Sequence, residues 1–208
     1  MFNPSDIEDL TAKDIYSCLL SDIPRPKIED KYPENNWSQI WKRLQNGVLS
    51  LESRSFLYLI IHERVGTKER GNRIMPGRYP SPHCPRCSDE NIRSVENIIH
   101  RYTQCILVEE VWEWVRSQIV SLDISLDLSL DKDLLSLNFP LGLRENAVMW
   151  LLGIFVELVE VEVVRKGNNL KIDQVIGIYK QRKQRAKHQA IPELGLILAL
   201  DDDAQGIG

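Results

Sequence analysis

Three cysteines and one histidine stand at a spacing that suits a metal ion. Two residues separate Cys84 from Cys87, twelve residues follow, and four residues separate His100 from Cys105. This C-x2-C-x12-H-x4-C (CCHC) pattern directs two thiolates from a turn and two ligands from a following helix at one ion, as in a tetrahedral zinc site. Because protein side chains fill all four positions, the pattern predicts a structural Zn²⁺ with no open position for catalysis.

Other interpretations of these residues stay open at this stage. Buried free thiols or a disulfide would also account for close cysteines. His83 is a second candidate for the histidine ligand, but it adjoins Cys84, and adjacent residues rarely point at one ion. Glu96 lies four residues before His100. We expect its carboxylate to hold the second imidazole nitrogen, or else to be a solvated acid near a helix N-terminus. Cys18 is remote and is expected to be a small core residue.

Apolar residues that recur at helical spacing place this pattern in a helical chain. A helix capped by Ser94 is expected to carry His100 on its flank. Ser50 is expected to cap a helix at 50–64, and Thr67 is expected to cap one at 68–74. The other helices are expected at 37–48, 108–119, 133–137, 144–165 and 170–189, and the apolar stripe of the helix at 108–119 consists of Val108, Val111, Trp112, Val115 and Ile119. The expected fold class is therefore mainly α: an irregular helical domain with a zinc-stapled Cys3His loop-helix module.

Four regions follow from composition. Residues 1–36 contain several prolines and are expected to form an N-terminal arm or linker. Residues 37–120 form the helical zinc-binding module, and residues 121–190 form a C-terminal helical region. Residues 191–208 end in an acidic run and are expected to be a loose tail.

The charge distribution points to an anionic partner more than the net charge of −4 does. From Arg64 to Arg86 there are six Lys or Arg residues against one acid. A local basic surface of this kind can bind phosphate while the whole chain stays acidic. The residues that we expect to contact nucleic acid are Lys68, Arg70, Arg73, Arg78 and Arg86. A second basic run, at 177–188, is either a solvated helix end or a further phosphate contact.

The sequence shows no signature of catalysis or of membrane insertion. There is no P-loop, no G-x-S-x-G elbow and no H-E-x-x-H pair. No nucleophile, base and orienting group assemble in the sequence, so we expect no enzyme activity. The longest apolar run, 147–156, is too short to cross a bilayer. The first residues do not resemble a secretory signal, which predicts an intracellular location, nuclear or cytoplasmic or both.

Five blocks in fixed order resemble a known family. They are Trp37-Ser-Gln-Ile-Trp41, Ser53-Arg-Ser-Phe-Leu-Tyr-Leu-Ile-Ile-His62, Thr67-Lys-Glu-Arg70, the Cys84–Cys105 pattern and Trp112. Together they look like the zinc-binding segment at the C-terminal end of non-LTR (LINE-type) retrotransposon reverse transcriptases. Leu10-Thr-Ala-Lys-Asp-Ile-Tyr16 resembles the stretch that leads into it, so the likeness covers roughly residues 10–120.

The resemblance implies that the four ligands bind zinc and that the module grips template RNA or target DNA during target-primed reverse transcription. Two positions depart from the family pattern: Gly66 stands where Pro is frequent, and Gly71 stands where Leu is usual. We expect these departures to weaken the helix at 68–74. The paired catalytic aspartates of the polymerase core are not found in this sequence, so the resemblance does not extend to polymerase activity.

Two functions are consistent with these observations. The first is a zinc-stabilised module that binds RNA or DNA. The alternative is a zinc-stabilised protein-interaction or scaffold module that binds no nucleic acid. In that case we expect the apolar helix at 145–165 to dock a protein partner or a second copy of the chain.

Overall fold

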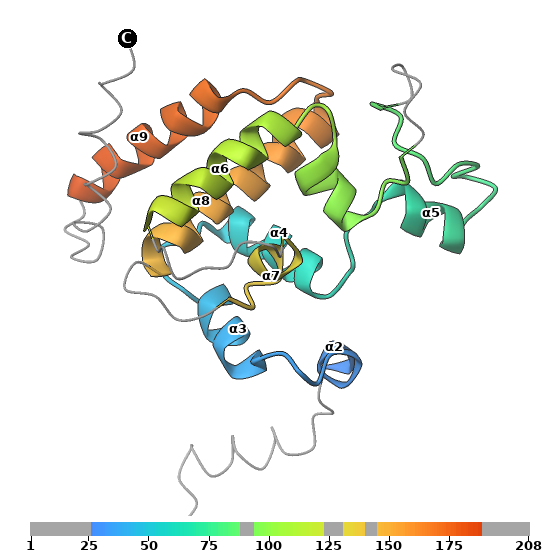
Figure 1. The fold of residues 1–208 in the computed structure, drawn as a ribbon, viewed down its shortest axis with the longest axis horizontal. Helices are drawn as coiled ribbons and strands as arrows, with labels where there is room; N and C mark the ends of the chain where they lie inside the picture. The colour runs from blue at the N-terminus through green and yellow to red at the C-terminus, as the bar shows by residue number, and fades with distance from the viewer. Residues whose placement is uncertain (1–25, 88–93, 123–130, 140–144, 189–208) are drawn as a thin grey trace, which may run out of the picture. The chain divides into compact units, whose positions relative to one another are not determined.

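The described part of this chain is built of helices. The structure is a computed structural model. It describes residues 26–87, 94–122, 131–139 and 145–188. Within these ranges there is no strand, and a single isolated antiparallel bridge joins His83 and Val95 (Figure 1). The predicted mainly α fold is therefore confirmed. Cys18 and the tail 191–208 lie outside the described residues.

The chain divides into two units, Met1–Asn35 and Asn36–Gly208. In the first unit the structure describes one short helix, α2 (Lys27–Lys31), which follows Pro26. The remaining described helices belong to the second unit. Helices from both sides of residue 120 thus share one compact unit, and the four-region division expected from composition stays a prediction.

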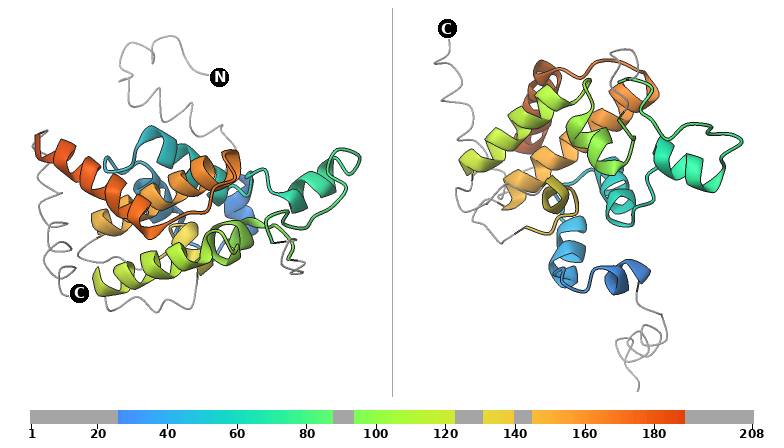
Figure 2. Two further views of the ribbon diagram at one scale, coloured as in Figure 1. Left: turned by 90° about the horizontal axis from the view of Figure 1, so that it is seen from above. Right: turned by 45° about the vertical axis from the view of Figure 1, so that its right-hand side comes forward.

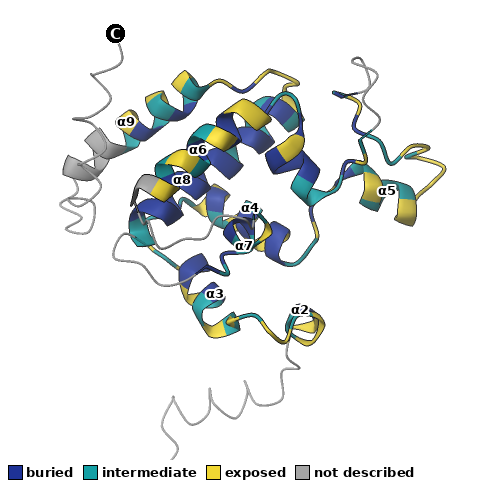
Figure 3. Cartoon of the chain, in the orientation of Figure 1, coloured by how far each residue is buried: buried dark blue, intermediate teal, exposed yellow. Residues whose placement is uncertain are grey.

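Helix α8 (Glu145–Leu158) lies at the centre of the second unit. Eleven of its 14 residues are buried, as expected for a helix that is apolar on every side (Figure 3). It packs against helices on several sides and continues directly into the π-helix η4 (Val159–Arg165). The predicted helix at 144–165 is therefore present. Because its apolar surface is already covered, the expectation that it docks a partner finds no support.

Two long helices cover α8. They are α6 (Glu109–Leu122) and α9 (Ile172–His188), and both contact it (Figure 2). The Trp112 ring of α6 packs on Phe155 of α8 with 5.2 Å between ring centroids. The predicted apolar stripe of this region is at most 1% exposed at every position; its members are Val108, Val111, Trp112, Val115 and Ile119. The stripe is core, as its spacing indicated.

Helix α4 (Leu51–Ile61) packs tightly against α8 at Gly153. It begins after Ser50, whose side chain accepts a hydrogen bond from the Ser53 backbone N–H, so the predicted cap is confirmed. The Ser53 hydroxyl donates to the carbonyl oxygen of Gly153 at 2.9 Å. A Cβ atom at Gly153 would lie 2.7 Å from Leu49 Cδ2 and 3.2 Å from Ser53 Cβ. The two helices can therefore meet at this distance only because residue 153 has no side chain.

A buried arginine joins α3 (Trp37–Leu44) to the segment that follows α7 (Asp131–Leu135). Arg43 is 1% exposed, and its Nη1 donates to the carbonyl oxygens of Leu137 at 2.8 Å and Phe139 at 2.6 Å. Helix α7 starts and ends two residues before the predicted 133–137. Leu137 has φ of 61°, a left-handed conformation that a right-handed helix does not continue.

Candidate metal centre

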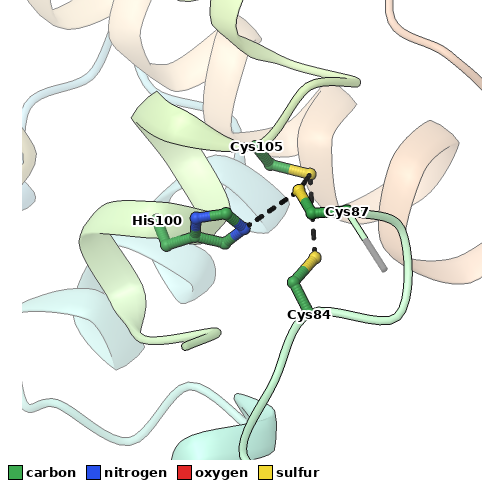
Figure 4. Close-up of side chains that lie close together, drawn as sticks. All are labelled: Cys84, Cys87, His100 and Cys105. Carbon is green, nitrogen blue, oxygen red and sulfur yellow. Dashed lines mark hydrogen bonds between the residues drawn. The ribbon is translucent and has the colours of Figure 1, made fainter. Parts of the chain in front are cut away.

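The four predicted ligands come together in one buried cluster. Their ligand atoms all lie within 4.8 Å of one another, so the cluster could hold a metal ion. Figure 4 shows the three sulfurs and the imidazole directed at a common point. The Sγ atom of Cys105 lies 3.9 Å from that of Cys84 and 4.0 Å from that of Cys87, and Cys87 Sγ lies 3.5 Å from His100 Nε2.

These separations match the edges of a tetrahedron around zinc. With Zn–S near 2.3 Å and Zn–N near 2.05 Å, ideal angles place two sulfurs about 3.8 Å apart and a sulfur and a nitrogen about 3.5 Å apart. A disulfide needs sulfurs near 2.0 Å, and the three cysteines are free thiols. The cluster contains His100 and does not contain His83.

A short paired segment positions the cysteine turn. The backbone N–H of Cys84 donates to the carbonyl oxygen of Ser94 at 2.8 Å, and the N–H of Glu96 donates to that of Pro82 at 2.9 Å. This pairing flanks the His83–Val95 bridge. It also explains why the next helix does not begin at Ser94 as expected. The backbone groups around Ser94 are already used in pairing, and Asn97 caps the helix instead, accepting a hydrogen bond from the His100 N–H at 2.8 Å.

A π-helix brings the other two ligands into line. His100 opens the π-helix η3 (His100–Gln104), and Cys105 is its C-terminal cap, with extended backbone. In an α-helix, residues five apart point about 140° apart, because each residue turns the helix by 100°. The wider i→i+5 turn of a π-helix reduces this angle. The wider turn therefore lets the H-x4-C spacing direct both ligands at one point.

The proximity of the three thiols perturbs their ionisation. A hydrogen bond from Cys105 lowers the pKa of Cys84 to about 3 against the opposing effect of burial. Burial raises the pKa of Cys87, and the hydrogen bond to Cys84 raises the pKa of Cys105. One thiolate is therefore favoured at the expense of its neighbours. A divalent metal between them would favour the ionised form of all three.

Glu96 is buried beside the cluster, but its partners differ from those expected. Its Oε1 accepts hydrogen bonds from Arg86 Nη2 at 2.7 Å and from Arg101 Nη2 at 2.7 Å. Within the described residues no hydrogen bond joins it to His100. Burial lowers the pKa of Arg86, but the charges of Glu96 and Cys84 outweigh this and raise it overall. Glu96 thus pairs with the guanidinium of Arg86, which lies within the cysteine turn, and does not orient the His100 imidazole.

A buried network continues from Glu96 to the centre of the unit. Arg101 is 4% exposed and bridges Glu96 to Glu160 of η4, with Nη1 3.3 Å from Glu160 Oε1. The Tyr102 hydroxyl donates to the same oxygen at 2.6 Å. Arg101, Tyr102 and Glu160 were not singled out from the sequence. Glu160 lies almost sixty positions after Arg101 and Tyr102 in the chain, and no local spacing signals such a contact.

The five predicted nucleic-acid contacts separate into two groups. Arg70 Nη1 donates to the backbone carbonyl of Glu63 at 3.1 Å, and Arg86 is paired with Glu96, so both support the fold. Arg73 and Arg78 are exposed and Lys68 is half-buried. These three lie on α5 (Lys68–Ile74) and the loop that follows it, directly before the cysteine turn.

Lys68, Arg73 and Arg78 form a basic element, in which the Tyr79 ring contacts two of the cations. The Lys68 ammonium lies 5.3 Å from the centroid of the Tyr79 ring, and the Arg78 guanidinium carbon lies 5.9 Å from it. A Cβ atom at Gly71 would lie 2.7 Å from the ring. Thr67 caps the helix by accepting from the Arg70 N–H. The helix therefore forms over the predicted residues, and the glycine that was expected to weaken it makes room for the tyrosine.

Comparisons with known proteins do not add to this description. No protein-family model matches the chain, and no curated protein or solved structure matches it. Of the helices that the structure describes, none is both long enough and apolar enough to cross a membrane. The likeness to retrotransposon reverse transcriptases therefore rests on the sequence blocks alone.

Proposed function

We propose that this chain is a structural zinc module that binds nucleic acid, of the type found at the C-terminal end of non-LTR retrotransposon reverse transcriptases. The Cys3His donor set supports zinc, because three thiolates and one imidazole suit a borderline-soft ion with tetrahedral preference. The observation that carries the binding function is the exposed basic element beside the metal centre, with Arg73 and Arg78 open to solvent.

The metal is tested first on protein purified without added zinc. Mass spectrometry is expected to find one zinc per chain. A different metal, or none, would contradict the assignment of zinc.

Nucleic-acid binding is tested by the salt dependence of the dissociation constant. Fluorescence anisotropy with labelled RNA and DNA oligonucleotides is recorded at several salt concentrations. Arg73→Gln and Arg78→Gln are each expected to reduce the slope of log K against log salt by about one, since each removes one phosphate contact. Lys171→Gln, at an exposed position before α9, is the matched charge control and is expected to leave the slope unchanged. Absence of binding, or binding insensitive to salt, would rule the function out.

The scaffold alternative has less to support it. It relied on a docking role for the apolar helix at 145–165, and that helix is covered by α4, α6 and α9.

A further inference from the structure

Four aromatic rings on α3 and at the end of α4 contact one another in succession. Trp37 and Trp41 stack with 5.5 Å between ring centroids and 27° between planes. Trp41 stacks on His62 at 5.5 Å and 25°, and His62 contacts Tyr58 at 4.2 Å and 45°. Trp37 and Tyr58 are thus the two ends of a ring row, defined as Trp37, Trp41, His62 and Tyr58.

The ring row is accessible although the core supports it. The two tryptophans and His62 are half-buried, and both tryptophans pack against the core. Tyr58 is 48% exposed, and its neighbour Leu59 is 38% exposed. A large aromatic residue that is held on one side and open on the other presents a preorganised surface, so a ligand loses little side-chain entropy on ordering it.

An exposed cation beside the ring row favours an anionic ligand. Arg64 lies two residues after His62, and its charge acts on the His62 imidazole. Burial lowers the pKa of His62, and the charge of Arg64 lowers it further. Both effects favour the neutral imidazole, and the exposed Arg64 guanidinium is available to phosphate.

The ring row is joined to the basic element through the end of α4. Glu63 has φ of 52°, and the Arg64 N–H donates to the Leu59 carbonyl while the Glu63 N–H donates to that of Ile60. This is a Schellman ending with a non-glycine residue in the left-handed position. Arg70 of α5 donates to the Glu63 carbonyl at 3.1 Å. The turn that ends α4, directly after His62, is thus hydrogen-bonded to α5, the helix that carries Lys68 and Arg73.

We propose that the outer faces of the two end rings, Trp37 and Tyr58, form a stacking surface for the unpaired bases of single-stranded RNA or DNA, with α5 following the phosphates. This rests on the nucleic-acid-binding function proposed above and specifies its ligand. Bases in a duplex already stack on their neighbours, whereas an unpaired base has free faces that an aromatic side chain can cover. Every base has such a face, so the surface selects single strands without selecting sequence.

The test compares a labelled 12-nucleotide single strand, as RNA and as DNA, with the matched duplex, using the zinc-loaded full chain. Tyr58→Ala is expected to weaken single-strand binding by about fivefold or more, the lower end of base-stacking effects. Tyr58→Phe keeps the ring and is expected to stay within about twofold. Leu51→Ala removes a side chain that is 74% exposed on the same helix and is expected to bind as the wild type does. Because Tyr58 carries no charge, the salt slope should not change.

The outcomes separate the two proposals. Salt-dependent binding that Tyr58→Ala and Trp37→Ala both leave unchanged would overturn the stacking surface and leave the basic element standing. Equal affinity for duplex and single strand would do the same. A wild-type chain that binds no oligonucleotide would overturn the function itself. Binding of a proline-rich peptide through Tyr58, with no oligonucleotide bound, would assign the ring row to a protein ligand and overturn the present assignment. Equal melting temperatures and zinc contents of the variants exclude misfolding as the cause.

Discussion

At the scale of single residues, local spacing identifies the four residues of the Cys3His cluster but not the side chains that support them. Cys84, Cys87, His100 and Cys105 could be chosen from the sequence because each pair lies within one turn or one helix. The arginines that pair with Glu96 could not be chosen in this way. A carboxylate four residues before a histidine could equally contact the imidazole or a guanidinium group. The fold decides by burying Glu96 between two arginines, where a charged partner is required.

The ligand assignment gives a direct prediction for Cys84→Ser. Apparent zinc binding free energies of about 10–16 kcal/mol at pH 7 are in part folding free energy, so losing one thiolate should release the metal and unfold the surrounding segment. His83→Ala is the matched control, because His83 is adjacent but outside the cluster. Zinc content and the melting temperature are measured for both. A Cys84→Ser protein with wild-type values would show that the four residues do not hold a metal.

At the scale of elements, the helices follow from apolar spacing, but their contacts depend on individual small residues. The caps at Ser50 and Thr67 lie where the sequence predicts them, because capping is a local interaction. The bend of the chain into the π-helix at His100 and the role of Gly71 beneath Tyr79 were not predicted. The spacing of apolar residues signals neither of them.

The contact between α4 and α8 predicts opposite effects for two glycines. Gly153→Ala should lower the free energy of unfolding by about 1–3 kcal/mol, since the new methyl group overlaps Leu49 and Ser53 in a packed core. Gly177→Ala in α9 meets no atom within 4 Å and should raise it by up to about 1 kcal/mol through helix propensity. Urea unfolding measures both. Equal effects of the two substitutions would contradict the close approach at Gly153.

At the scale of the whole unit, polar side chains join segments that are distant in sequence. Glu157 on α8 accepts from Arg182 of α9 at 2.6 Å and lies 2.8 Å from the Ser50 hydroxyl at the start of α4. Burial raises the pKa of Glu157, but these hydrogen bonds outweigh it and lower the pKa overall. The carboxylate thus contributes to stability in its charged form.

The sign of this shift predicts the pH dependence of stability. A depressed pKa in the folded state means that the contribution is complete above the ordinary Glu pKa of about 4.3 and is lost as the pH falls through the folded value. Glu157→Gln should therefore lower the free energy of unfolding by about 1.5–3 kcal/mol at pH 7, and this difference should shrink in acid. Glu113→Gln, at a side chain that is 60% exposed, is the control and should show little effect. A difference that stays constant with pH would contradict the role of the charge.

The sequence by itself determined what depends on near neighbours: the four residues of the Cys3His cluster, the helical stripes, two of the caps and the basic element before the cysteine turn. Tertiary structure alone decided which basic residues are free for a ligand. Arg70 and Arg86 are taken up by Glu63 and Glu96, whereas Arg73 and Arg78 stay exposed. The ring row was likewise decided by the packing of α3 against α4. The physical reason is the same in each case, because burial and pairing depend on which distant segments meet, and local spacing carries no record of that.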